Sequence, residues 1–220
     1  MTTLPPDPRT TYDATDPVED APLAHKHALT RAVKRVIELS AHLDVDAVPD
    51  GTVEGFTAEI DALADRMERH PSLLARGGLG SCGGHPGALL ERSGIAGRSN
   101  QLAAPVQWVT DADGITRGWA TYSAAYEGPA GSLHGGFVAA AFDDLLGSAQ
   151  TASGIAGYTG TLTVRMIRPT PLHRRIDYEA GVDRVEGRKI YVWGTADSEG
   201  VRLAEAEIVF IAPRDGTRPR

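Results

Sequence analysis

The stretch from His134 to Ala152 constrains the fold more than any other part of the sequence. Its apolar residues recur at steps of three and four, as on a helix, and they cover most of the circumference of that helix. Such a helix is stable only when other parts of the chain remove it from water. Strand-like runs occur on both sides of it, so we expect an α+β fold in which an antiparallel sheet wraps around a long central helix.

The strand-like runs are short and alternate between apolar and other residues. The first two are joined by the turn signal Asp113-Gly114, which is typical of a β-hairpin. The last two are separated by the turn Ser198-Glu199-Gly200. The predicted strands are 106–109, 115–126, 161–168, 176–185, 189–196 and 203–212. The C-terminal half is therefore expected to follow the order hairpin, helix, meander.

The N-terminal half divides into segments of different composition. Residues 1–22 contain five prolines and five acidic residues, which predicts a disordered tail. Residues 23–75 carry two amphipathic helical patterns and predict a helical extension. Residues 76–99 are rich in glycine and predict a linker. The domain of sheet and central helix is accordingly assigned to residues 100–213.

The overall charge and the apolar pattern exclude several kinds of partner. The chain has 22 Lys and Arg against 29 Asp and Glu, a net charge of −7, which argues against a nucleic-acid partner. No apolar run reaches the roughly 18 residues that cross a bilayer, so no membrane partner is expected. A secretory signal is not recognisable and the single cysteine cannot form an internal disulfide, so we expect a cytoplasmic protein. The histidines lack metal-ligand spacing, and no metal is expected.

The segment that leads into the apolar helix is the most specific motif of the chain. It has the sequence Tyr-Glu-Gly-Pro-Ala-Gly-Ser-Leu-His-Gly-Gly and ends at Gly136. The first N–H groups of a helix have no partner within it, and the paired glycines Gly135 and Gly136 leave these groups unshielded by side chains. Such a turn can bind an anion or the oxyanion of an acyl-transfer reaction. A flexible loop capped by glycine is the alternative.

Two adjacent carboxylates, Asp143 and Asp144, lie in the middle of the apolar helix. They are costly there unless hydrogen bonds satisfy them or the protein uses them. One of them can therefore be a general base with its pKa raised by burial. Alternatively, they form a cap or ordinary salt bridges on a solvent-facing strip. The helical period does not decide between the two positions.

Several motifs in the right order resemble the PaaI/THEM4-like acyl-CoA thioesterases of the hotdog-fold superfamily. They are Gly-Pro-Ala-Gly-Ser-Leu-His-Gly-Gly from Gly128, the Asp nine residues after His134, Arg168-Pro169-Thr170-Pro171-Leu172 and Arg184-Val185-Glu186-Gly187-Arg188-Lys189. The resemblance implies a hotdog fold that dimerises through the sheet edge, as a homodimer or as a dimer of dimers (a homotetramer). It also implies hydrolysis of an acyl-CoA substrate at the dimer interface, without a cofactor.

Carried over by position, the resemblance implies roles for individual residues. Asp143 is implied to be the catalytic carboxylate, as general base or as nucleophile, and Gly135 and Gly136 are implied to donate to the oxyanion. Thr159 is implied to orient the water or the carboxylate, with Thr161 as the alternative for this last role.

The spacing within the helix independently favours a site shared between two chains. Gly136 and Asp143 are seven residues apart, which is roughly 10 Å along a helix. One carbonyl carbon can hardly meet both from one helix, whereas two antiparallel copies of the helix can supply one group each. A homodimer is therefore expected to be required for catalysis. For His134, the resemblance implies that it holds the loop at the substrate rather than transfers a proton, because the family puts the chemistry on the carboxylate.

Coenzyme A carries phosphates, and one part of this acidic chain is dense in basic residues that suit them. These residues are Arg165, Arg168, Arg184, Arg188 and Lys189. Arg188 and Lys189 are the expected phosphate contacts, because they follow the Glu186-Gly187 turn. The alternative is that these basic residues only cover a solvent-exposed face of the sheet. Asn100 is expected either to line the mouth of the site or to act as a structural cap.

Three other functions fit part of the sequence pattern. A non-catalytic acyl-CoA or acyl-chain binding protein of the same fold would keep the pocket without turnover, but Asp143 with the paired glycines favours the enzyme. A hotdog hydratase needs an Asp/His pair, and no His follows Asp143 at a suitable spacing. Residues 78–83 fit the G-x-G-x-x-G pattern, but without a preceding strand they do not predict a dinucleotide site.

Overall fold

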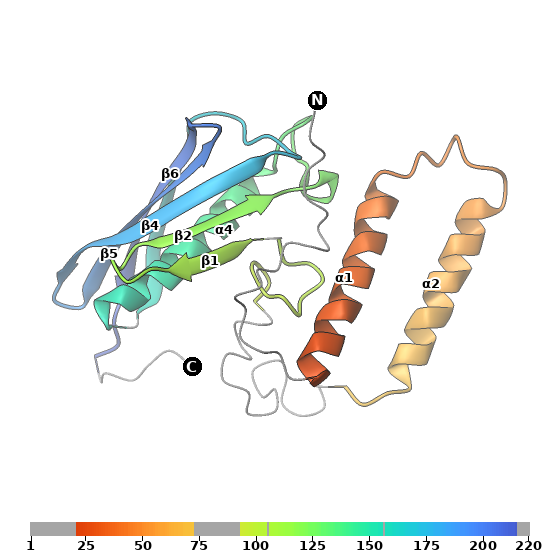
Figure 1. Ribbon diagram of the computed structural model, residues 1–220, viewed down its shortest axis with the longest axis horizontal. Helices are drawn as coiled ribbons and strands as arrows, with labels where there is room; N and C mark the ends of the chain where they lie inside the picture. Colours follow the sequence, from red (N-terminus) through yellow and green to blue (C-terminus); the bar gives the residue numbers. More distant parts are fainter. Residues whose placement is uncertain (1–20, 73–92, 105, 156, 215–220) are drawn as a thin grey trace.

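In a computed structural model, the chain forms a domain of one sheet and one central helix, with a pair of helices beside it (Figure 1). The structure describes residues 21–72, 93–104, 106–155 and 157–214. The elements are α1 (Ala21–Ala41), α2 (Thr52–Glu68), β1 (Gln107–Thr110), β2 (Thr116–Thr121), the 3₁₀ turn η3 (Ala124–Tyr126), α4 (Gly135–Ala149), the 3₁₀ turn η4 (Gln150–Ser153), β3 (Tyr158–Met166), β4 (Arg175–Glu186), β5 (Lys189–Ser198) and β6 (Val201–Ile211).

The strands form a single antiparallel sheet in the order β1-β2-β4-β5-β6-β3. β4, β5 and β6 are a meander, and β5 is joined to β6 by a two-residue turn at Glu199 and Gly200. Both turn residues have positive φ, 51° and 78°, which matches the twist of a tight hairpin. β3 comes before β4 in the chain but lies at the far edge of the sheet, so the connection between them crosses the sheet.

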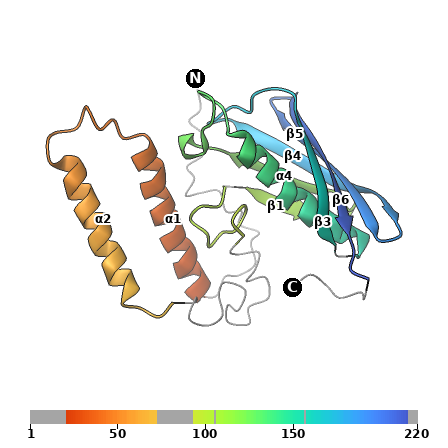
Figure 2. The same ribbon diagram turned by 180° about the vertical axis from the view of Figure 1, so that it is seen from behind.

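The central helix α4 packs against one face of the sheet (Figures 1 and 2). It buries the side chains of Val138, Ala141, Phe142, Leu145, Leu146 and Ala149. Each large apolar side chain removed from water contributes about 1.5–3 kcal/mol. On β5, alternate residues point into the same core, and a Cβ at Gly194 would lie 2.9 Å from Leu146 Cδ2. Glycine at this position lets the helix approach the strand closely.

The structure confirms the expected α+β fold, with the predicted central helix and the order hairpin, helix, meander. It differs from the prediction for residues 115–126, because β2 ends at Thr121 and Ala124–Tyr126 form η3 instead of a strand. This turn redirects the chain so that the Tyr126 carbonyl accepts the N–H of His134 at 3.0 Å. β3 ends at Met166 because the next two N–H groups both donate to the Leu203 carbonyl.

The helical extension predicted for residues 23–75 is the pair α1 and α2. α1 contacts η3, where Ser123 Oγ donates to Glu38 Oε1 at 3.3 Å. α2 lies farther from the sheet than α1 in both views (Figures 1 and 2) and has no buried residue. Within the described residues, no helix is long and apolar enough to span a membrane. Most of the predicted tail and linker lies outside the described residues, so the domain boundaries stay a prediction.

Candidate active site

Asp143 lies on the exposed side of α4, in the middle of the helix. The hydroxyl of Thr159, near the start of the edge strand β3, donates a hydrogen bond to Asp143 Oδ1 at 3.2 Å. The pairing of β3 with β6 is irregular between Thr159 and Thr161, and such bulges change the direction in which side chains point. Of the two threonines considered from the sequence, the structure brings Thr159 to the carboxylate.

The neighbouring carboxylate, Asp144, has a different environment. Its Oδ2 accepts a hydrogen bond from Trp108 Nε1 at 2.9 Å, and its Oδ1 accepts one from Ser93 Oγ at 3.2 Å. Burial raises the pKa of Asp144 above its usual value, and the two hydrogen bonds oppose that shift. Asp144 therefore ties α4 to β1 and to the segment before it.

His134 is the N-cap of α4, and its Nδ1 accepts the Gly136 N–H at 3.0 Å. The Gly135 N–H has no acceptor among the residues that the structure describes. The sequence led us to expect oxyanion donors at both glycines. In the structure only the Gly135 N–H is free to donate, because the imidazole engages the other one.

The glycines at the helix start and in the loop before it have close neighbours. A Cβ at Gly136 would lie 3.0 Å from His134 Nδ1, and a Cβ at Gly135 would lie 3.2 Å from Met166 Cε. In the preceding loop, a Cβ at Gly128 would lie 2.7 Å from His134 Cα. The contact at Gly128 is with the backbone and is closer than real side chains pack, so this arrangement of the loop requires glycine there. At Gly135 and Gly136 a side chain would require its neighbour to shift by a few tenths of an ångström.

These contacts define how β3 lies relative to α4. Thr159, near the start of β3, is beside Asp143, and Met166, at its end, is beside Gly135. β3 therefore runs alongside α4 in the opposite direction. Gly135 and Asp143 are eight residues apart, which is about 12 Å along a helix. A single chain places the oxyanion donor and the carboxylate at two separate points.

The basic residues predicted to bind coenzyme A fall into two groups. The first group is at the end of β3 that lies beside Gly135. Arg165 is exposed, with Nη1 at 3.9 Å from Glu205 Oε2. Arg168 follows the strand, and its Nη1 donates to the Arg202 carbonyl at 2.8 Å. Both guanidinium groups therefore keep N–H groups that can reach a ligand.

The second group is at the other end of β3. Lys189 pairs with Ile211 of β6, and Ile211 also pairs with Tyr158 at the start of β3. Arg188 precedes Lys189, and its Nη1 donates to the Ala212 carbonyl at 3.0 Å. A strand of nine residues is about 30 Å long, so one chain does not bring the two groups together. The basic residues expected to form one cluster therefore form two groups, at opposite ends of β3.

Two other residues considered from the sequence have local partners. Asn100 Oδ1 accepts the Leu102 N–H at 2.9 Å, which is the bonding of a structural cap, seven residues before β1 begins. Arg184 Nε donates to Glu186 Oε1 at 2.7 Å, and its guanidinium lies 3.7 Å from the centre of the Tyr191 ring. The role of Asn100 in substrate binding stays a prediction.

Sequence reasoning did not find three residues of this region. Trp108 and Ser93 hold Asp144 from positions 36 and 51 residues away, and no local pattern reports such contacts. Met166 lies beside Gly135 only because of the register between β3 and β6. Among the described residues, no group of three or more His, Cys, Asp or Glu is arranged to hold a metal ion.

No protein-family model matches the chain. Among solved structures, the chain is similar to the crystal structure of a thioesterase superfamily protein. The sequences are 28% identical and the TM-score is 0.73, and the match covers 84% of this chain and 94% of that one.

Two further structures are similar at lower scores. One is a phenylacetic acid degradation-related protein from Ralstonia eutropha, with 22% identity, a TM-score of 0.44, and coverage of 49% of this chain and 83% of that one. The other is a hypothetical thioesterase of Streptococcus pneumoniae with coenzyme A, with 14% identity, a TM-score of 0.47, and coverage of 52% and 91%. The chain therefore has the hotdog fold, and it is similar in structure to a protein of the thioesterase superfamily.

Proposed function

We propose that the protein is an acyl-CoA thioesterase, which hydrolyses an acyl-CoA thioester to a free acid and coenzyme A. One observation carries the proposal: α4 presents a free Gly135 N–H at its start and an exposed Asp143 carboxylate, held by Thr159, in its middle. Hydrolysis of an acyl group requires an oxyanion donor of this kind together with a base or a nucleophile. The likeness to the crystal structure of a thioesterase superfamily protein supports the same reaction class.

The two groups can act on one carbonyl carbon if two chains combine. β3 is an edge strand, and most of its residues are exposed. Unpaired edges of this length are ready to pair with another strand. If the β3 strands of two chains pair in antiparallel fashion about a two-fold axis, the Thr159 end of one strand meets the Met166 end of the other. Asp143 of one chain is thereby brought toward Gly135 of the other.

The exposed side of α4 suits this arrangement. Gly136, Ala140 and Gly147 are seven, three and four residues from Asp143, so they share its face of the helix. Their side chains are small, so a second copy of α4 can approach closely. The two basic groups at opposite ends of β3 would also meet, the Arg165 group of one chain with the Lys189 group of the other. Such a double group can hold the phosphates of coenzyme A.

In the proposed reaction, the thioester oxygen accepts a hydrogen bond from the Gly135 N–H. Asp143 of the other chain takes a proton from water as the water attacks the carbonyl carbon, or it attacks that carbon itself and forms an anhydride that water then opens. Thr159 holds the carboxylate in position through its hydrogen bond to Oδ1. The carbon–sulfur bond breaks, and the thiolate of coenzyme A leaves and takes up a proton.

The test is release of free thiol from acyl-CoA substrates that range from acetyl to palmitoyl and include phenylacetyl and benzoyl. The native protein is compared with Asp143→Asn and with the matched control Asp144→Asn, which removes the same charge one residue away. We expect hydrolysis of at least one substrate and a loss of at least about 100-fold in kcat for Asp143→Asn. The control should keep most of its activity.

Three results would contradict the proposal or one of its parts. A protein that binds the thioesters without releasing thiol would be a binding protein. If Asp144→Asn loses activity and Asp143→Asn does not, the catalytic carboxylate is Asp144 and not Asp143. Full activity in a monomer would exclude a site shared between chains.

A further inference from the structure

The side chain of Gln150 connects the end of the central helix to the segment that leads into the edge strand. Gln150 is the C-cap of α4 and is half-buried. Its Oε1 accepts the Gly157 N–H at 3.0 Å, and its Nε2 donates to the Gly157 carbonyl at 3.4 Å. A residue of a neighbouring strand pairs with both backbone groups of its partner in the same way. The amide of Gln150 therefore holds the backbone of Gly157 as a strand would.

The residue held in this way is two positions before Thr159, whose hydroxyl donates to Asp143 Oδ1. Gly157 is buried, and a Cβ there would lie 2.9 Å from Phe210 Cβ on β6. The strand β6 thus limits the path of the segment on one side, and Gln150 limits it on the other.

The sheet alone gives the start of β3 little support. Only Tyr158 and Thr159 pair with β6 before the register shifts between Thr159 and Thr161. A bulge of this kind interrupts the ladder and changes where the neighbouring side chains point. The direction of the Thr159 side chain therefore depends on what holds the chain just before it, which is the bond pair between Gln150 and Gly157.

The helix places Gln150 on the correct side for this contact. Gln150 keeps helical backbone angles, with φ −57° and ψ −25°, and it follows Asp143 by seven residues. Seven residues are about two turns of a helix, so the two side chains leave α4 on the same face, roughly 10 Å apart. One face of α4 therefore carries both the carboxylate and the amide that holds the segment of Thr159.

We propose that Gln150 is a positioning residue of the hydrolysis reaction. It fixes the backbone at Gly157 so that the hydroxyl of Thr159 reaches Asp143, and it acts through Thr159 and not on the substrate. This inference rests on the function proposed above, because it assigns a role within that same site.

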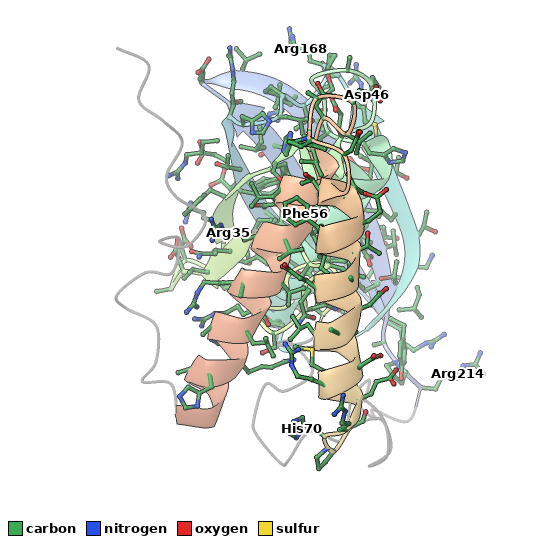
Figure 3. All side chains as sticks on the ribbon, turned by 90° about the vertical axis from the view of Figure 1, so that its right-hand side faces the viewer. Arg35, Asp46, Phe56, His70, Arg168 and Arg214 are labelled. Atoms are coloured by element: carbon green, nitrogen blue, oxygen red, sulfur yellow. The ribbon has the colours of Figure 1, made fainter. Side chains whose placement is uncertain are left out.

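The contact lies far from the start of α4. Figure 3 labels Arg168, which follows β3, and Arg214, which follows β6, and the two lie at opposite ends of the sheet. The end of β6 pairs with the start of β3, so Gly157 is at the end marked by Arg214. Gly135 is beside the other end of β3. Loss of the Gln150 contact should therefore change kcat, through the carboxylate, and leave KM unchanged.

The first test is steady-state hydrolysis of an acyl-CoA that the native protein cleaves. Met is similar in length to Gln but forms neither bond, and we expect Gln150→Met to lower kcat about 10-fold, as Thr159→Val does, with KM unchanged. The variant with both changes should be no slower than Thr159→Val, because both changes remove the same hydrogen bond. Gln150→Glu keeps an oxygen that accepts the Gly157 N–H, so its kcat should stay within about 3-fold of the native value.

The matched control is Thr151→Val, one residue further on. It removes a hydrogen bond from the exposed Thr151 hydroxyl to the Ser148 carbonyl at 2.7 Å, and it should leave kcat unchanged. A loss of about 100-fold in the variant with both changes would show that Gln150 and Thr159 act independently, and this would overturn the proposal. The same conclusion would follow if Thr151→Val were as slow as Gln150→Met, or if Gln150→Glu were.

Two NMR measurements do not require activity or a folded Gln150→Met variant. In the native protein, the Gly157 amide should exchange slowly with D₂O, and exchange at the rate of an unfolded chain would overturn the proposal. Three-bond couplings of the Thr159 methyl carbon report its χ1 angle, which should be a single rotamer in the native protein and in Gln150→Glu but averaged in Gln150→Met. A single native rotamer in Gln150→Met would also overturn it. If the native protein passes both measurements and releases no thiol, the proposed function fails while the structural role of Gln150 holds.

Discussion

Replacing Trp108 with Phe tests the part that we assign to Asp144. The indole Nε1 donates to Asp144 Oδ2 at 2.9 Å, and the ring packs edge-on against Tyr178, with 5.2 Å between the ring centres. Phe preserves most of the ring contact but removes the donor. A hydrogen bond to a charged group contributes about 1.5–3 kcal/mol. Since Asp144 is only partly buried, we expect a loss of about 1.5–2 kcal/mol in the free energy of unfolding at neutral pH.

The loss should depend on pH in a defined direction. Burial already raises the pKa of Asp144 in the folded state, and removing a hydrogen bond to the carboxylate raises it further. A carboxyl group with a raised pKa holds its proton more tightly when the protein is folded, so folding is favoured as the pH falls toward the unfolded value of about 3.9. The destabilisation by Trp108→Phe should therefore be full at neutral pH and should shrink on acidification.

The assay is urea unfolding at a fixed protein concentration, at neutral and at mildly acidic pH. It compares the native protein, Trp108→Phe, Asp144→Asn and the variant that carries both changes. In the Asn background the lost bond is between uncharged groups, so Trp108→Phe should cost about 1 kcal/mol less there. An equal cost in both backgrounds, or a cost that does not change with pH, would refute the assignment of Asp144 as a charged anchor of α4.

Two further predictions concern the site and the sheet. Thr159→Val should lower kcat for acyl-CoA hydrolysis by about 10-fold at unchanged stability, because it removes the hydrogen bond to Asp143. The control Thr161→Val should leave kcat unchanged. Equal effects of the two changes in steady-state kinetics would argue against this role of Thr159. Gly118→Ala should lower the urea unfolding midpoint, because its Cβ would clash with the Gln107 carbonyl oxygen of β1. An unchanged unfolding midpoint would contradict the close approach of β1.

The fold could be predicted from the sequence where one local pattern determines one element. The apolar residues of α4 recur at helical steps, and they are buried as expected. Residues 124–126 could not be predicted in this way, because the apolar alternation continues through them. In the structure these residues form a 3₁₀ turn, and the Tyr126 carbonyl accepts the N–H of His134 from the start of another element.

The sequence indicated which residues are candidates for the site, but it could not distinguish the environments of Asp143 and Asp144. Asp143 and Asp144 are equivalent in the helical pattern, and the choice of Asp143 came from the family resemblance. The structure distinguishes them through Trp108 and Ser93, which are remote in the sequence. Similarly, the basic residues are close in the sequence, but the length of β3 keeps its two ends apart. Contacts between distant segments therefore account for what the sequence pattern alone could not supply.

The position of β3 in the sheet has a consequence for how the chain folds during synthesis. Within its own chain, β3 pairs with β6, the last strand to be made. Its bonding partner begins 35 residues after β3 ends, at Val201. Pairing between distant segments is slow because a long loop must close first. Until β6 emerges from the ribosome, both edges of β3 and part of the apolar side of α4 remain exposed, and a chain cut before Val201 should aggregate.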